Sequence, residues 1–305
     1  MPLRPRQRPE FLASGATVAL VAPAGGLRGE EDVARAIFNV RSLGWEPAIG
    51  RYALEHDGYF AGSDAQRLAD LNAALRDPAI DAIWCLRGGY GTARLLPEID
   101  LDSLTRVPRP VIGFSDVTAL HCAIQRRCGI VSFHGPVARA ELGEFSRSSL
   151  LRAVTSLEDP AGRAEHARTI RGGSAEGVLA GGNLAVLTSL VGTPFAPELD
   201  GAILVLEDIG ERTYRIDRML RQLLQAGLLD GCNAILFGEC TDCSDRTESG
   251  ERSLDAVLGE IADLLHVPCI AGAPVGHIAE QWTLPLGALA VLDADNCLLE
   301  IPHNR

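Results

Sequence analysis

Apolar runs alternate with segments of helical spacing along residues 1–130. Short apolar runs that end in glycine or in a polar pair predict buried strands at 16–26, 80–91 and 109–116. Helix-spaced segments follow them, and the clearest of these begins at Ser63 and ends before Pro78. The order strand, helix, strand, helix predicts a parallel sheet covered on both faces. Ligands of such sheets bind at the carboxyl ends of the strands.

The pattern changes between residues 146 and 175, where the chain is polar and lacks a strong apolar period. We interpret 146–175 as a linker between an N-terminal, flavodoxin-like α/β domain at 1–145 and a smaller C-terminal α/β domain at 176–305. The second domain is expected to have a β-rich core. Its strand-like runs are AILVLED, CNAILFGE and LAVLDADN, and its helix-like runs are YRIDRMLRQLLQAG and SLDAVLGEIADLL.

Composition narrows the class of protein. The 305 residues include 47% hydrophobic and 22% charged residues, which is ordinary for a globular protein. A formal net charge of −12 argues against a nucleic-acid partner, which would require a basic face. No apolar run approaches the ~20 residues that cross a bilayer, and the basic N-terminus MPLRPRQRPEF lacks the apolar segment of a signal peptide. We therefore expect a cytoplasmic protein without a membrane partner.

All 28 basic residues are arginine, and the chain contains no lysine. This excludes a P-loop lysine, a pyridoxal Schiff base and a Ser–Lys dyad. A serine nucleophile in this chain would need a different base.

The eight cysteines are scattered, and several lie in apolar runs, which is typical of reduced, buried thiols. Cys240 and Cys243 form a single CxxC, which is a weak metal signal without a second pair. We interpret them as loop cysteines and expect neither a metal nor another cofactor.

Ser115 ends a predicted strand, in the sequence GFSD, just before a helix-spaced segment. Its side chain could cap the helix. Alternatively, it could be a nucleophile, and the helix start would then stabilise the oxyanion that forms on the substrate carbonyl. Val117 stands where a G-x-S-x-G nucleophile elbow requires its second glycine. The local pattern leaves both interpretations open.

Three further features could complete such a site, although each has a structural alternative. The turn 87–91, RGGYG, could supply a backbone N–H to an oxyanion or could simply be tight. Two histidines compete as the base: His134 ends an apolar run, and His277 lies in an irregular, Gly/Pro-rich stretch between apolar runs. His121 falls inside a helix-like segment and is expected to pack there. Glu207 ends a strand-like run and could orient a histidine or belong to a capped, solvated turn.

Taken together and in order, these segments resemble the LD-carboxypeptidases, the muramoyl-tetrapeptide carboxypeptidase family of serine peptidases. The resemblance extends over almost the whole chain. Its motifs are VAP at 21–23, YFAGSDAQRLADLNAAL at 59–75, RGGYGTARLLP at 87–97, GFSDVTALH at 113–121, HGP at 134–136, GGNL at 181–184, LED at 206–208, YRIDRML at 214–220, GH at 276–277 and TLPLG at 283–287.

The resemblance implies that Ser115 is the nucleophile, His277 the base and Glu207 the carboxylate that orients it. His134 matches a family motif outside this triad. The backbone N–H groups of Asp116 and Gly89 are then the expected oxyanion hole. The residues expected to bind substrate are Arg87, which could pair with a carboxylate or anchor the turn, together with Tyr90 and Asn183.

The implied reaction releases the terminal D-Ala from a murein tetrapeptide, at the bond after meso-diaminopimelate, during cytoplasmic cell-wall recycling. The family also suggests a homodimer. The alternative is a serine peptidase of the microcin C immunity type, which cleaves peptidyl or aminoacyl nucleotides. That activity needs an aromatic platform for a base, and residues 150–175 contain no Trp, Tyr or Phe.

Overall fold

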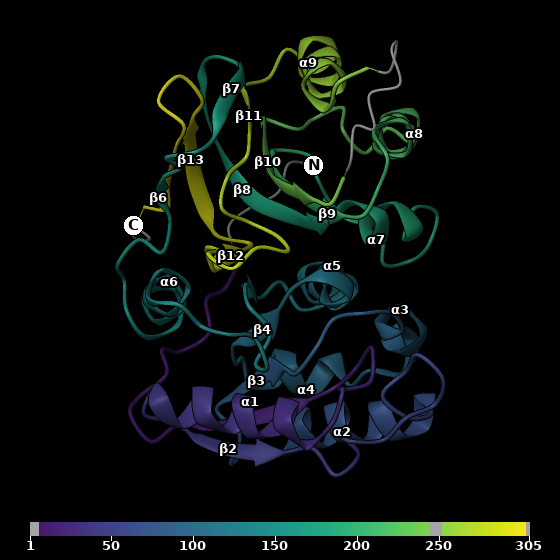
Figure 1. The fold of residues 1–305 in the computed structure, drawn as a ribbon, viewed down its shortest axis with the longest axis vertical. Coiled ribbons are helices and arrows are strands. Elements are labelled where there is room, and N and C mark those ends of the chain that lie inside the picture. Colours follow the sequence, from purple (N-terminus) through teal and green to yellow (C-terminus); the bar gives the residue numbers. More distant parts are fainter. Residues whose placement is uncertain (1–5, 244–251, 303–305) are drawn as a thin grey trace.

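The computed structural model describes residues 6–243 and 252–302, which form two β-sheets with helices packed around them (Figure 1). The first sheet is built mainly from the N-terminal half of the chain, and the second from the C-terminal half. Among the described residues, no helix is both long and apolar enough to cross a membrane.

The first sheet has six strands in the order β12-β5-β4-β3-β1-β2. Strands β1 to β5 are parallel, and their order 2-1-3-4-5 is the flavodoxin-like arrangement, as predicted. β12 is added at one edge and runs antiparallel to β5. The strands are β1 (Thr17–Val21), β2 (Glu46–Ile49), β3 (Ala82–Cys85), β4 (Val111–Gly113), β5 (Ser132–His134) and β12 (Leu284–Leu286).

Apolar side chains on both faces of this sheet are buried, because helices cover it on each side. Alternate residues of β1 point to opposite faces: Val18 and Leu20 pack with helix α1 (Glu30–Ser42) in one core, while Ala19 and Val21 belong to the other. The second core includes helices α2 (Asp64–Arg76) and α5 (Thr118–Arg127). This two-sided burial explains the nearly continuous apolar runs in the sequence.

The second sheet has eight strands in the order β6-β14-β13-β8-β9-β10-β11-β7. Its centre, β8 to β11, is parallel, and antiparallel strands flank it on both sides. The strands are β6 (Gly162–Arg163), β7 (Arg168–Arg171), β8 (Ser174–Asn183), β9 (Ala202–Ile209), β10 (Ala234–Thr241), β11 (Cys269–Ala271), β13 (Leu289–Asp293) and β14 (Leu298–Glu300).

The remaining α-helices range from 4 to 13 residues in length. Helices α7 and α8 lie beside each other near the end of β9, and α9 lies close to β7 and β11 (Figure 1). The elements are α3 (Thr92–Leu95), α4 (Leu101–Arg106), α6 (Glu144–Thr155), α7 (Leu184–Ser189), α8 (Thr213–Gln225) and α9 (Leu254–Leu265), with 3-10 turns η1 (Leu96–Glu98) and η2 (Ser115–Val117).

The segment 146–175, which we interpreted as a linker, contains regular structure. Most of α6 lies there, and strands β6 and β7 join the second sheet through β14 and β11. Arg163 and the residues of β7 remain partly or fully exposed, so these edge strands lack the apolar period of buried ones. The domain limits themselves remain a prediction.

Candidate active site

Ser115 lies two residues after the end of β4, at the carboxyl end of the parallel strands of the first sheet. Its backbone has φ +63°, in the left-handed region that non-glycine residues rarely adopt. Such strain persists where surrounding structure imposes it, and it is concentrated at functional sites. The conformation sets Ser115 at a sharp turn between β4 and α5, with its side chain partly accessible.

The Ser115 hydroxyl is hydrogen-bonded to His277, whose other ring nitrogen is bonded to Glu207. The distance from Ser115 Oγ to His277 Nε2 is 3.0 Å, and that from His277 Nδ1 to Glu207 Oε2 is 2.8 Å. Glu207 lies near the carboxyl end of β9 and is fully buried, whereas His277 is 18% exposed. The three side chains that the resemblance grouped together therefore meet, from different sheets.

Two glycines permit this close packing. A Cβ on Gly276 would lie 2.9 Å from the Glu207 Cβ, and the residue has φ +121°, so only glycine suits this position before His277. A Cβ on Gly88 would lie 2.9 Å from Ser115 Oγ. Gly88 is thus the glycine of the 87–91 turn whose backbone lies against the Ser115 side chain.

Ser115 does not cap the following helix. The first residues of η2 and α5 receive no side-chain hydrogen bond at their N-caps, which are Phe114 and Val117. The cap interpretation is therefore wrong: the positive φ turns the hydroxyl toward His277 instead of toward the helix N–H groups.

The other predicted residues of the 87–91 turn are Gly89, Arg87 and Tyr90, and each contacts a different part of the protein. Gly89 has φ +109° and packs against Gly25 of the first turn. Arg87 donates a hydrogen bond to the carbonyl of Gly26, which shows that it does anchor the turn. Tyr90 is 51% exposed, and its ring contacts Tyr59 and Phe60.

Asn183 ends β8 beside Glu207, its partner in the sheet register. Its Oδ1 accepts from the N–H of Val186 at the start of α7, and its Nδ2 donates to Asp208. Burial raises the pKa of Asp208 to about 6, against the opposing effect of its hydrogen bonds. Both polar groups of Asn183 are thus bonded within the protein, and its role in substrate binding remains a prediction.

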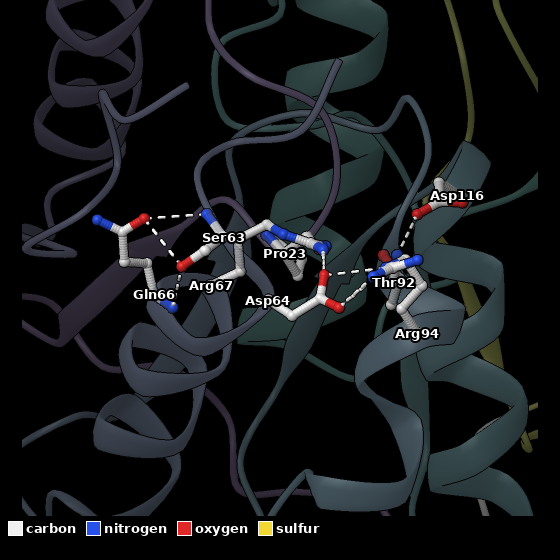
Figure 2. A network of polar contacts seen from close by, with 8 residues as sticks. All are labelled: Pro23, Ser63, Asp64, Gln66, Arg67, Thr92, Arg94 and Asp116. Atoms are coloured by element: carbon white, nitrogen blue, oxygen red, sulfur yellow. Dashed lines mark hydrogen bonds and ion pairs between the residues drawn. The ribbon is translucent and has the colours of Figure 1, made fainter. Parts of the chain in front are cut away.

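The Asp116 carboxylate is a positioning group that sequence reasoning missed. The side chain is buried, and its Oδ2 accepts from the N–H of Thr92 at 2.8 Å (Figure 2). Burial raises the pKa of this carboxyl, while hydrogen bonds from Thr92 and Gly91 lower it. The bond joins the Ser115 turn to the start of α3, which directly follows the 87–91 turn.

Arg67 of α2 extends this framework to the first turn. Its guanidinium is fully buried, donates to the Pro23 carbonyl and pairs with Asp64, which also binds Arg94 (Figure 2). Phe60 stacks beneath it at 4.6 Å. The motif at 59–75 therefore contributes a buried guanidinium, paired with the partly exposed Asp64, that holds three strand-end segments together. Nothing in the local spacing of the motif predicted its contact with Pro23.

His134 and His121 lie together beneath the site. Both ring nitrogens of His121 are bonded, to Ser132 and to the Gly113 carbonyl, which confirms a packing role. His134 is completely buried, and neither ring nitrogen has a partner within the described part of the chain. Burial is the main cause that lowers its pKa, and together with the neighbouring His121 and His277 it brings the pKa to about 3.

Cys240 and Cys243 are joined by a disulfide, contrary to our expectation of unpaired loop cysteines. The other six cysteines are free, and most are buried. Between the pair, Thr241 donates its hydroxyl to the His277 carbonyl at 2.9 Å. Across residues 6–243 and 252–302, no cluster of three His, Cys, Asp or Glu side chains is arranged to hold a metal.

Comparisons with known proteins agree with the motifs. A putative carboxypeptidase of Streptomyces coelicolor is 40% identical over 98% of this chain and 97% of its own length. The murein tetrapeptide carboxypeptidase of Pseudomonas aeruginosa is 38% identical, over 91% of this chain and 93% of its own.

Solved structures show the same fold. The muramoyltetrapeptide carboxypeptidase of Oxalobacter formigenes superposes with a TM-score of 0.83 at 31% identity, covering 93% of this chain and 97% of that one. An MccF-like protein of Bacillus anthracis gives 0.87 at 25%, covering 98% and 100%. Residues 18–135 match the LD-carboxypeptidase N-terminal domain, and 176–292 match the C-terminal domain. The chain thus belongs to the LD-carboxypeptidase family of peptidases.

Proposed function

We propose that this protein is a serine carboxypeptidase that releases the terminal D-Ala from murein tetrapeptide through an acyl-enzyme. The observation that carries the proposal is the continuous series of hydrogen bonds from Ser115 through His277 to Glu207. Relatives named as murein peptide and murein tetrapeptide carboxypeptidases supply the substrate class.

In the first step, His277 Nε2 takes the Ser115 proton as Oγ attacks the carbonyl carbon of the diaminopimelate–D-Ala bond. Glu207 accepts the Nδ1–H, fixes the tautomer and stabilises the imidazolium. The tetrahedral intermediate collapses when His277 returns that proton to the D-Ala nitrogen, which leaves as the free amino acid. Water then attacks the ester with His277 again as base, which regenerates Ser115 and the tripeptide.

The oxyanion needs fixed N–H donors. We propose the N–H of Asp116 and a glycine N–H of the 87–91 turn, for which Gly89 is the sequence prediction. The packing of Gly88 against Ser115 and the bond from Thr92 to Asp116 support this placement, because they bring the two turns together. Cytoplasmic cell-wall recycling and a homodimer complete the proposal.

Cleavage of a peptidyl or aminoacyl nucleotide is the second candidate. The likeness to an MccF-like protein favours it, and so does an aromatic surface beside the 87–91 turn. Tyr59 is 68% exposed and Tyr90 is 51% exposed, so both rings are available to stack on a base. The murein relatives are more similar in sequence, which keeps the carboxypeptidase as the first proposal.

The deciding experiment incubates the protein with L-Ala-γ-D-Glu-meso-diaminopimelate-D-Ala and measures free D-Ala. Wild type should release D-Ala, and Ser115→Ala should reduce the rate by a factor on the order of 10⁶, as loss of a serine nucleophile does. Ser189→Ala, an exposed serine on α7, is the matched control and should keep wild-type activity. Cleavage of an aminoacyl-sulfamoyl adenylate without D-Ala release would favour the second candidate.

A further inference from the structure

Three arginines follow three strands of the first sheet, at the edge where Ser115 follows β4. Arg28 comes after β1, Arg87 after β3 and Arg139 after β5. Since β4 lies between β3 and β5, the last two arginines come from strands on either side of the one that ends at Ser115. Ligands of a parallel sheet bind at this edge.

Asp32, on the first turn of α1, joins two of these arginines. It accepts from the backbone N–H of Arg28 at 2.9 Å and from the Arg139 guanidinium at 3.5 Å. Asn39 of α1 donates to the carbonyls on both sides of Arg139, each at 2.8 Å, so the backbone there is fixed on the helix. The backbone at Arg28 and the backbone and guanidinium of Arg139 are therefore held by α1.

Arg87 belongs to the same cluster. Burial lowers the pKa of its guanidinium, the nearby charges of Arg139 and Arg28 lower it further, and Asp32 opposes them. Its bond to Gly26 uses one of five N–H donors and leaves the others for a ligand. The Arg139 Nε is buried without a partner among the described residues.

The cluster carries more positive than negative charge. In the described parts of the chain, Asp32 is the one carboxylate that interacts with all three residues: with the backbone N–H of Arg28, with the Arg139 guanidinium and, through its charge, with Arg87. Glu30 and Glu31 at the start of α1 are exposed, and within the described residues neither is hydrogen-bonded to or paired with the three arginines. Such an excess is notable in a chain of net charge −12, because like charges gather at a cost unless an anion offsets them.

The cluster also lies close to the Ser115 site. The N–H of Gly25 donates to the Gly88 carbonyl at 3.0 Å, which joins the turn before Arg28 to the turn that contains Arg87. Gly88, the next residue after Arg87, packs against Ser115. A group bound by the arginines would thus be part of a molecule whose reacting bond lies at Ser115.

We propose that Arg28, Arg87 and Arg139 form a carboxylate-binding site for the peptide substrate. Guanidinium groups bind carboxylates through paired, charge-assisted hydrogen bonds. The inference rests on the proposed function and assigns it two residues, Arg28 and Arg139, that sequence reasoning had not selected. The tetrapeptide has carboxylates on D-Ala, D-Glu and diaminopimelate, and the position of Arg87 one residue before Gly88 favours the terminal one.

The test measures binding to a Ser115→Ala protein, which separates recognition from chemistry. Calorimetry compares the tetrapeptide with three analogues, amidated at the terminal, D-Glu or diaminopimelate carboxyl. Arg28→Gln and Arg139→Gln are introduced one at a time. Arg87 is left unchanged because it also anchors its turn, whereas the Arg28 guanidinium has no hydrogen-bond or ion-pair partner among the described residues. Arg41→Gln, an exposed arginine in the last turn of α1, is the matched control.

Each site variant should weaken binding of the tetrapeptide about tenfold and leave binding of the terminal amide unchanged, while Arg41→Gln changes neither. The same pattern with one of the other amides would support the site and identify a different carboxylate. Equal weakening for all four peptides, or no weakening, would overturn it, as would failure of the Ser115→Ala protein to bind any of them. If the arginine variants weaken binding in this way but wild type releases no D-Ala, the carboxylate-binding site stands and only the proposed function fails.

Discussion

His277 and His134 both contact the Phe114 ring, with ring centroids at 4.8 and 5.9 Å from it, yet their surroundings are opposite. His277 is partly exposed, and both ring nitrogens are bonded, to Ser115 and Glu207. His134 is completely buried, and neither ring nitrogen has a described partner. Burial without a partner disfavours the charged imidazolium, whereas a carboxylate beside the ring stabilises it. Hydrogen-bond partners of the ring nitrogens and exposure to solvent therefore distinguish a candidate base, His277, from a packed histidine, His134.

The two histidines should differ most in how much the rate of D-Ala release falls when each imidazole is removed. His277→Ala should lower the rate of D-Ala release by a factor on the order of 10⁶, because the Ser115 proton then has no acceptor. His134→Leu should remain within about tenfold of wild type. Steady-state kinetics on the tetrapeptide measures both. A loss of equal size in the two variants would mean that His134 takes part in proton transfer.

A smaller effect is expected from the partner of His277. Glu207→Gln keeps the shape of the side chain but replaces its charge with an amide that can donate to Nδ1 and favour the wrong tautomer. The expected loss in kcat is on the order of 10⁴. Glu211→Gln, a nearby glutamate that pairs with Arg215, is the control and should have little effect. Full activity of Glu207→Gln would show that His277 does not depend on this carboxylate.

The smallest effect is one of stability. The pKa of His134 is about 3 in the folded protein, against 6.5 for a free imidazole. As pH falls, His134 is therefore protonated in the unfolded chain before it is protonated in the folded protein. The contribution of the neutral, buried His134 to the free energy of unfolding is fully present above pH 6.5 and is lost progressively as pH falls toward about 3. At pH 5 the loss from His134 is about 2 kcal/mol.

Urea unfolding at pH 7 and at pH 5 measures that difference. Between the two pH values, wild type should lose about 2 kcal/mol more free energy of unfolding than His134→Leu does. His166→Gln, at an exposed loop position, should behave as wild type. The same pH dependence in wild type and His134→Leu would mean that the folded protein binds a proton at His134 as readily as the unfolded chain.

Elements with a strong local period could be predicted from the sequence. β1, β3 and β4 and helices α1, α2 and α5 agree with the predicted segments, because each buries a face whose spacing is visible along the chain. β2 was not predicted, since it is a short edge strand that contains Pro47 and is only partly buried. The register of β12 could not be predicted either, because its partner β5 is remote in sequence.

The candidate site was only partly accessible to sequence reasoning. Local patterns drew attention to Ser115 and Glu207 but left His134 and His277 equal, and only the family motifs separated them. The fixed contacts of Arg67 and Asp116 were not predictable, because they join segments that are distant in sequence. A positive φ at Ser115 also has no signature in the residues GFSD.

The segment that contains His277 is anchored at both ends, and in different sheets. It leaves the second sheet at β11 and enters the first at β12, which covers the edge of β5. A protein cut after residue 145 would therefore lose more than its second sheet: the edge of β5 would be open to pairing with another chain. Because residues 272–283 connect the two sheets, a change in the distance between the sheets would also change the position of His277 relative to Ser115 and Glu207.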